Sequence, residues 1–247
     1  MNTRLNDPAP DQPFRGAAAE RGGLNVLWLQ SGGCGGCSMS LLCADTTDFQ
    51  GHLRDAGVNL LWHPSLSMES GHELLTLLDA VLQGHTRLDA LCVEGSLLRG
   101  PNGTGRFHTL AGTGLPMIDW VRRLSARARH VVAVGSCAAW GGITAGGDNP
   151  TEACGLQYED DEIGGLLGAA FRSGSGLPVI NVAGCPTHPS WVIDTLMALA
   201  ADGFGADDLD RSTARVSTPT SWCTTAAPAT STTSSRPARR SPATWAA

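Results

Sequence analysis

Five short apolar segments alternate with longer stretches of helical periodicity, and this alternation limits the possible folds more than any other feature of the chain. The apolar segments cover residues 25–30, 59–63, 88–93, 130–134 and 178–182. Each is almost continuously apolar, as strands buried on both faces of a parallel sheet are. Helices are predicted over residues 39–49, 69–82, 117–128, 162–171 and 189–200. The alternation predicts an α/β, doubly wound layer structure, and it leaves the order of the strands open.

The composition narrows the class of protein further. The chain has 247 residues, enough for one substantial domain or for a domain with a smaller lobe. Its hydrophobic fraction of 42% permits a core, while no apolar run reaches the roughly 18 residues of a membrane span. The net charge is −6, and Lys and Arg are scattered along the chain, so nucleic acid is not expected as a partner.

The two ends of the chain differ from its middle. Residues 1–23 have neither an apolar h-region nor a twin-arginine pair, which predicts a disordered leader, no secretory signal and a cytoplasmic location. Any association with a membrane is then expected to be peripheral and made through partners. Residues 211–247 are rich in Ser, Thr, Ala and Pro and lack an apolar period, which predicts an irregular tail. The folded domain is therefore predicted over residues 24–210.

Four of the eight cysteines follow the ends of predicted strands. Cys34 and Cys37 come after the first strand, Cys137 after the fourth and Cys185 after the fifth, while Glu94 follows the third. Ligands of an open parallel sheet bind outside the carboxyl ends of its strands, so we expect these side chains to converge. In a reducing cytosol, paired cysteines indicate metal or redox chemistry rather than structural disulfides.

Four converging thiolates indicate either a zinc ion or an iron–sulfur cluster. Structural zinc sites commonly pair two short Cys-x-x-Cys loops, whereas here one such pair is joined by two distant single cysteines. Glycines flank the candidate ligands and offer a cube-shaped cluster both room and backbone N–H donors: Gly32, Gly33, Gly35, Gly36, Gly135 and Gly184. The residues alone thus favour a 4Fe–4S cluster, with a zinc site and a thioredoxin-like redox pair as alternatives. The GGCGG segment lacks the spacing of a phosphate-binding loop.

Four segments carry a resemblance to a known family: VLWLQSGGCGGCSMSLL, VEGS, GSCAAWGG and VAGCPTHP. In this order and spacing they resemble the flavodoxin-like domain of nickel–iron hydrogenase small subunits, over residues 24–204 of this chain. The resemblance implies that a proximal 4Fe–4S cluster is bound by Cys34, Cys37, Cys137 and Cys185. The GCGGC motif and the N-terminal start of the chain resemble those of the actinobacterial-type, hydrogen-oxidising members of this family.

The resemblance also implies a reaction and a partner. The reaction H₂ ⇌ 2H⁺ + 2e⁻ would take place at the nickel–iron site of a large subunit, and this chain would accept the electrons through its cluster. We identify no nickel ligands in the chain, so the isolated chain is not expected to be active. Arg106 and His108 are implied to lie near the subunit interface. Glu94 is a candidate for contact with the large subunit, for proton movement or for a structural hydrogen bond, and the downstream electron acceptor stays open.

Departures from related patterns bear on this assignment. The related quinone-reductase subunit of respiratory complex I has adjacent cysteines in its first motif, whereas two residues separate Cys34 from Cys37. Oxygen-tolerant membrane-bound relatives have an additional cysteine where Gly36 stands, so their modified cluster is not expected here. An Asp replaces a cysteine ligand in some relatives, which makes Asp45 a reserve candidate. A complex I-like subunit and a non-enzymatic zinc or structural protein remain the alternatives.

The remaining cysteines receive other interpretations. Cys92 lies inside a predicted strand and Cys43 on a predicted helix, and a packed, inert thiol is expected at both positions. Cys154 is expected in a loop and is assigned no role. Cys223 lies in the tail.

The tail differs from the second domain of the family, which holds two further clusters. Residues 217–227 read STPTSWCTTAA. These residues can be back-translated into permitted codons, and the bases can then be read in the frame that begins with the last base of the preceding codon. In that frame they encode a hydrophobic residue followed by YADELVHHGC, which resembles part of that second domain. We therefore predict that residues 211–247 are a frameshifted remnant, with the shift near Arg211 and Cys223 as its product. Such a chain holds one cluster and lacks the relay beyond it.

Overall fold

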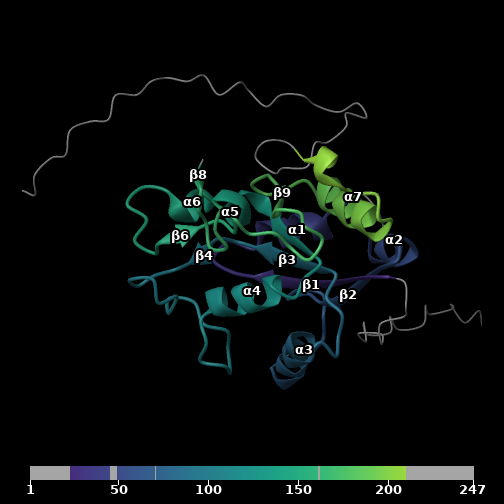
Figure 1. Ribbon diagram of the computed structural model, residues 1–247, viewed down its shortest axis with the longest axis horizontal. Coiled ribbons are helices and arrows are strands. Elements are labelled where there is room, and N and C mark those ends of the chain that lie inside the picture. Colours follow the sequence, from purple (N-terminus) through teal and green to yellow (C-terminus); the bar gives the residue numbers. More distant parts are fainter. Residues whose placement is uncertain (1–22, 45–48, 70, 161, 210–247) are drawn as a thin grey trace, which may run out of the picture. The chain divides into compact units, whose positions relative to one another are not determined.

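The computed structural model describes residues 23–44, 49–69, 71–160 and 162–209. Their centre is a five-stranded sheet in the order β2-β1-β3-β5-β9 (Figure 1). The strands are β1 (Leu24–Gln30), β2 (Val58–Trp62), β3 (Ala90–Glu94), β5 (His130–Val134) and β9 (Ile180–Val182). Each pairing in this sheet is parallel. The order is that of flavodoxin-like, doubly wound folds, which confirms the predicted fold class and the five predicted strands.

Successive side chains of the strands pack into two hydrophobic layers, one on each face of the sheet. On β3, Leu91 belongs to one layer and Cys92 to the other, and both are fully buried. This alternation is the two-residue period of a strand, and burial on both faces explains why the strand sequences are continuously apolar.

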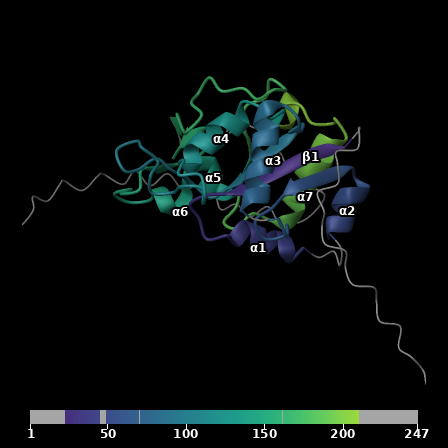
Figure 2. The ribbon, with the colours of Figure 1, turned by 90° about the horizontal axis from the view of Figure 1, so that it is seen from below.

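Helices cover both faces of the sheet. The first layer includes residues of α3 (His72–Gln83) and α4 (Met117–Ser125); the second includes residues of α1 (Gly36–Leu42), α2 (Phe49–Asp55) and α7 (Pro189–Ala200). In Figure 1, α3 and α4 lie below the sheet and α1 and α7 lie above it, so α3 and α4 are on the near side in Figure 2, which is seen from below.

Shorter elements surround the carboxyl ends of the strands. They are the helices α5 (Gly135–Trp140) and α6 (Gly142–Ala145), the antiparallel pair β4 (Leu97–Leu98) and β6 (Ala153–Cys154), and the antiparallel pair β7 (Tyr158–Glu159) and β8 (Glu162–Ile163). A 3₁₀ turn over Ala206–Asp208 follows α7. The sequence predicted none of these elements, because each is too short to show a hydrophobic period.

Two of the predicted helices differ from the structure. The helix predicted over residues 39–49 is divided: α1 ends at Leu42 and α2 begins at Phe49, with residues 45–48 outside the described residues. The helix predicted over residues 162–171 is wrong, because β8 is followed there by turns.

The physical reason for the second error is a tertiary contact. The backbone N–H groups of Leu166 and Leu167 donate to the carbonyl oxygens of Gly155 and Leu156, at N···O distances of 3.0 and 2.7 Å. Gly165 makes this approach possible, since a Cβ there would lie 2.5 Å from the Gly155 oxygen. Pairing with a distant segment thus satisfies the backbone groups that a helix would have used internally.

The predictions for the chain ends stay predictions. The leader predicted over residues 1–23 lies outside the described residues except for Gly23, and the tail predicted over residues 211–247 lies wholly outside them. Within the described ranges, no helix is both long and apolar enough to cross a membrane.

A test of the packing around α5 comes from Gly155. A Cβ at this position would lie 2.1 Å from the Ala139 carbonyl oxygen, which belongs to the backbone of α5 and cannot move alone. We expect Gly155→Ala to lower the free energy of unfolding by about 2 kcal/mol or more, measured by urea denaturation. The matched control is Gly164→Ala, whose Cβ would meet nothing within 4 Å and which should change the stability little.

Candidate functional site

The four cysteines predicted to converge lie at the carboxyl edge of the sheet. Cys34 is in the loop after β1, and Cys37 is in the first turn of α1. Cys137 is on α5, which begins directly after β5, and Cys185 is in the loop after β9. The thiols are close enough to affect one another electrostatically. In addition to burial, Cys34 and Cys137 raise the pKa of Cys37, and Cys185 and Cys34 raise the pKa of Cys137. The structure therefore brings the four thiols into one neighbourhood.

Glycines let the sulfur atoms approach the backbone. A Cβ at Gly135 would lie 2.4 Å from the Cys37 sulfur, and one at Gly142 would lie 2.8 Å from the Cys137 sulfur. Both glycines have positive φ, at +83° and +57°, a region that other residues rarely adopt. A Cβ at Gly36 would lie 3.0 Å from the Cys34 sulfur. A side chain at any of these positions would fill the space beside the sulfur atoms.

Burial affects the protonation of two of the thiols. It raises the pKa of the Cys37 thiol to about 11, a hydrogen bond from the Thr187 backbone opposes that rise, and the negative charge of Glu94 adds to it. Burial also raises the pKa of Cys137, and the neighbouring Cys185 contributes in the same direction. Both thiols are therefore protonated at neutral pH in the absence of a cation, since a buried thiolate lacks solvation. A cation that binds here has to displace those protons.

The Glu94 carboxylate fixes the start of α1. Its Oε1 accepts the backbone N–H groups of Cys37 and Ser38, at 3.0 and 3.1 Å. Its Oε2 accepts the Ser38 hydroxyl at 2.5 Å and the Trp28 indole N–H at 3.2 Å. The N-cap residue Gly35 has no side chain, so Glu94 supplies from β3 the acceptor that a capping residue normally provides. These contacts favour the structural hydrogen-bonding role for Glu94 over contact with a large subunit or proton movement.

The loop after β4 brings His108 to the same edge. The His108 Nδ1 lies 3.4 Å from the Ser31 hydroxyl, and Ser31 follows β1 directly. Burial lowers the pKa of His108, so its imidazole is neutral at neutral pH. Arg106 is exposed on the same loop.

The other cysteines divide into buried and exposed. Cys92 is fully buried in β3, as predicted, and burial raises its pKa. The prediction of a packed thiol at Cys43 is wrong: this residue is the C-cap of α1 and is exposed, because α1 ends there instead of continuing. Cys154 is not in a loop but in β6, buried, with its thiol 3.7 Å from the Leu97 carbonyl oxygen. Asp45 and Cys223 lie outside the described residues.

Sequence reasoning missed Ser38, His63 and Thr187. The Ser38 hydroxyl lies between Glu94 and His63, and the Thr187 carbonyl accepts the Ser40 hydroxyl at 2.8 Å, which ties α1 to the Cys185 loop. His63 directly follows β2. The cysteines were chosen as site candidates because they follow strand ends, and the same criterion would have identified this histidine.

No three side chains of His, Cys, Asp or Glu in the described part of the chain are close enough to hold a single metal ion. A zinc ion with Zn–S bonds of about 2.3 Å needs its four sulfurs about 3.8 Å apart. The four thiols thus lie at one edge of the sheet, but they are not as close together as a single zinc ion would require.

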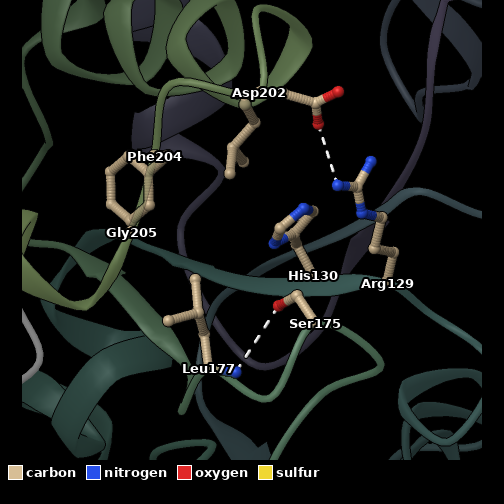
Figure 3. A pocket seen from close by; sticks show the side chains of 8 residues that line it. Arg129, His130, Ser175, Leu177, Asp202, Phe204 and Gly205 are labelled. Carbon is tan, nitrogen blue, oxygen red and sulfur yellow. Dashed lines mark hydrogen bonds and ion pairs between the residues drawn. The ribbon is translucent and has the colours of Figure 1, made fainter.

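A separate cavity of about 220 Å³ lies at the amino end of β5 (Figure 3). Arg129 and His130 line it on one side and Phe204 on another, and Arg129 forms an ion pair with Asp202 at 2.8 Å. Because His130 begins β5 and Cys137 follows its end, the cavity is at the opposite edge of the sheet from the thiols.

Comparison with known proteins assigns the family. A family model described as "NADH ubiquinone oxidoreductase, 20 Kd subunit" matches residues 34–199. The chain belongs to this family. It is 32% identical over 190 residues to the small subunit of F420 non-reducing hydrogenase I of Methanosarcina mazei, covering 70% of this chain and 47% of that protein. It is 31% identical over 178 residues to the hydrogenase-2 small chain of Escherichia coli, covering 72% and 43%.

A solved structure extends the comparison. The chain resembles an actinobacterial-type NiFe-hydrogenase of Ralstonia eutropha with a TM-score of 0.66 and 31% identity, over 78% of this chain and 58% of that one. The similarity to hydrogenase small subunits that the sequence motifs indicated is thereby confirmed. The chain spans about half the length of the curated relatives it matches.

Thiol reactivity tests the arrangement in the metal-free, full-length chain. At about pH 8 a thiol of pKa near 11 is ionised to roughly one part in a thousand, and the thiolate is the reactive form. We therefore expect iodoacetamide to label the exposed Cys34, Cys43 and Cys185 first, Cys37 slowly, and Cys92 only after unfolding. Peptide mass spectrometry over a time course measures the order, and labelling of Cys37 should accelerate as the pH rises. Equal rates at Cys34 and Cys37 would contradict the described burial.

Proposed function

We propose that this chain is the electron-transferring small subunit of a nickel–iron hydrogenase and that four thiolates hold one 4Fe–4S cluster: Cys34, Cys37, Cys137 and Cys185. The observation that carries the proposal is the approach of four thiols from three separate strand ends within a glycine-lined edge. Four cysteines are the usual ligand set of such a cluster. The similarity to hydrogenase small subunits supports the same function.

The surroundings of the thiols suit a cluster. Gly36 donates its backbone N–H to the Cys34 sulfur at 3.3 Å, and the Thr187 backbone donates to the Cys37 sulfur. Backbone donors to the sulfurs stabilise thiolates and affect the reduction potential of a cluster. When bound, the cluster accepts and releases single electrons. The protein's part is to hold it, to orient it by the two-residue spacing of Cys34 and Cys37, and to exclude water with buried elements on its inner side.

A large subunit that carries the nickel–iron site is the proposed partner, and hydrogen oxidation there the proposed source of electrons. Large apolar side chains are exposed on α1, which bears Cys37, and on two segments without a candidate cysteine: Met39 is 58% exposed on α1, Ile143 is 83% exposed on α6, and Phe107 is 55% exposed beside Arg106 and His108. We propose that these side chains belong to the surface that the large subunit covers, because a partner that binds there would remove their apolar area from water. We assign Arg106 and His108 to the same interface.

A complex I-like quinone oxidoreductase subunit is the second candidate, because the matching family model has that name. The spacing of Cys34 and Cys37 and the hydrogenase relatives favour the first. Reduction of a quinone by a purified complex that contains no nickel would favour the second.

Cluster content tests the ligand assignment. Anaerobically purified protein should contain about four irons and four sulfides per chain, and its reduced form should give an EPR signal at low temperature. Cys137→Ala removes one ligand, so both iron and signal should be lost. Cys43→Ser is the matched control, because this cysteine is also exposed and follows α1 without belonging to the set, and it should retain both. Stoichiometric zinc without iron would reject the proposal.

We also propose that residues 211–247 are a frameshifted remnant of a second, cluster-binding domain. Resequencing the DNA around the codon of Arg211 is expected to reveal an inserted or deleted base, after which the frame encodes YADELVHHGC. An intact frame that encodes the present tail would disprove the frameshift and leave the ligand assignment untouched.

A further inference from the structure

A buried histidine lies next to the candidate cluster ligands without being one of them. His63 follows β2, is 1% exposed, and packs against the Trp28 ring with 4.9 Å between ring centroids. Trp28 in turn donates its indole N–H to the Glu94 carboxylate. The imidazole therefore packs against the same indole ring that donates a hydrogen bond to Glu94.

The hydrogen bonds of His63 determine its tautomer. The backbone N–H of Ser65 donates to Nδ1 at 3.0 Å, so Nδ1 is the acceptor and carries no proton. Burial lowers the pKa of His63 to about 4, so the ring is neutral at neutral pH and its single proton is on Nε2. Nε2 lies 3.4 Å from the Ser38 hydroxyl oxygen and donates to it.

This tautomer gives the next bond its direction. Because the Ser38 oxygen accepts from His63, its own proton points to the Glu94 Oε2, 2.5 Å away. Glu94 accepts the backbone N–H of Cys37 through its other oxygen. The bonds thus form one directed series from the turn after β2, through α1, to the end of β3 and back to the candidate ligand Cys37.

We propose that His63 is a positioning residue which, through Ser38 and Glu94, holds the backbone of Cys37 in the conformation that presents its thiol to the cluster. The relevance to a cluster rests on the proposed function, whereas the series of hydrogen bonds does not. A buried carboxylate is stable only while its donors are in place, and each donor strengthens the next when they are joined in series. Loss of the imidazole donor would free the Ser38 hydroxyl to rotate and weaken the attachment of α1 to Glu94.

Two substitutions separate the two nitrogens of His63. His63→Asn places an amide oxygen near the Nδ1 position, so it keeps the acceptor for Ser65 and loses the donor to Ser38. His63→Gln places an amide N–H near the Nε2 position, so it keeps the donor and loses the acceptor. Both variants lose the ring and its contact with Trp28, so they differ only in the hydrogen bond that each keeps and in one methylene group.

Amide hydrogen exchange of the metal-free, full-length chain is the first measurement. In His63→Asn we expect the Cys37 and Ser38 amides to exchange at least about tenfold faster, while that of Val132 in β5 keeps its protection. In His63→Gln the Cys37 and Ser38 amides should exchange at wild-type rates, and that of Ser65 should exchange faster. Wild-type exchange at Cys37 in His63→Asn, or equal acceleration in both variants, would overturn the proposal.

The cluster-loaded protein supplies a second readout. His63→Asn should shift the midpoint potential and the EPR spectrum of the reduced cluster, and His63→Gln should retain both. Ser38→Ala removes the middle of the series, so it should reproduce the shift of His63→Asn, and the double variant should add little. If no variant, nor the wild type, holds iron, the proposed function fails while the exchange experiment still decides the role of His63.

Discussion

The parallel pairing of the central strands is the constraint on which the rest of the structure depends. Gln30, Glu94 and Val134 stand opposite one another in the ladder, so β1, β3 and β5 end in one row. The loops and helices after these strands therefore emerge at the same edge, even where their residues are far apart in the chain. Both faces of the sheet are covered by helices, which leaves this edge as the place where polar and reactive side chains gather.

A buried carboxylate joins that edge to the helix that carries Cys37. Glu94 is 3% exposed, and removing its charge from water is costly unless donors replace the lost solvation. Two backbone N–H groups, one hydroxyl and one indole N–H do so. The same bonds that stabilise the charge hold the start of α1 against β3, so the stability of Glu94 and the position of Cys37 have one physical origin.

The four candidate thiols differ in their exposure to solvent. Cys34 and Cys185 are exposed, whereas Cys37 and Cys137 are half-buried, so the candidate site has an inner side within the domain and an outer side at its surface. Electron transfer weakens steeply with distance, and a centre at the rim of a domain allows close approach. The hydrogenase small subunits that resemble this chain are about twice as long as their matched part, so they contain a further region that the similarity does not cover.

The sequence by itself determined the strands, the fold class and the set of converging cysteines, because continuous apolar runs and residues at strand ends are local features that the parallel sheet preserves. Only the tertiary structure decided the short α1, the turns over residues 164–171 and the roles of Ser38 and His63. Leu166 and Leu167 satisfy their backbone groups on residues 155 and 156, and Ser38 meets a carboxylate 56 positions away. Such contacts depend on which segments the folded sheet places side by side, and no local pattern in the chain records that.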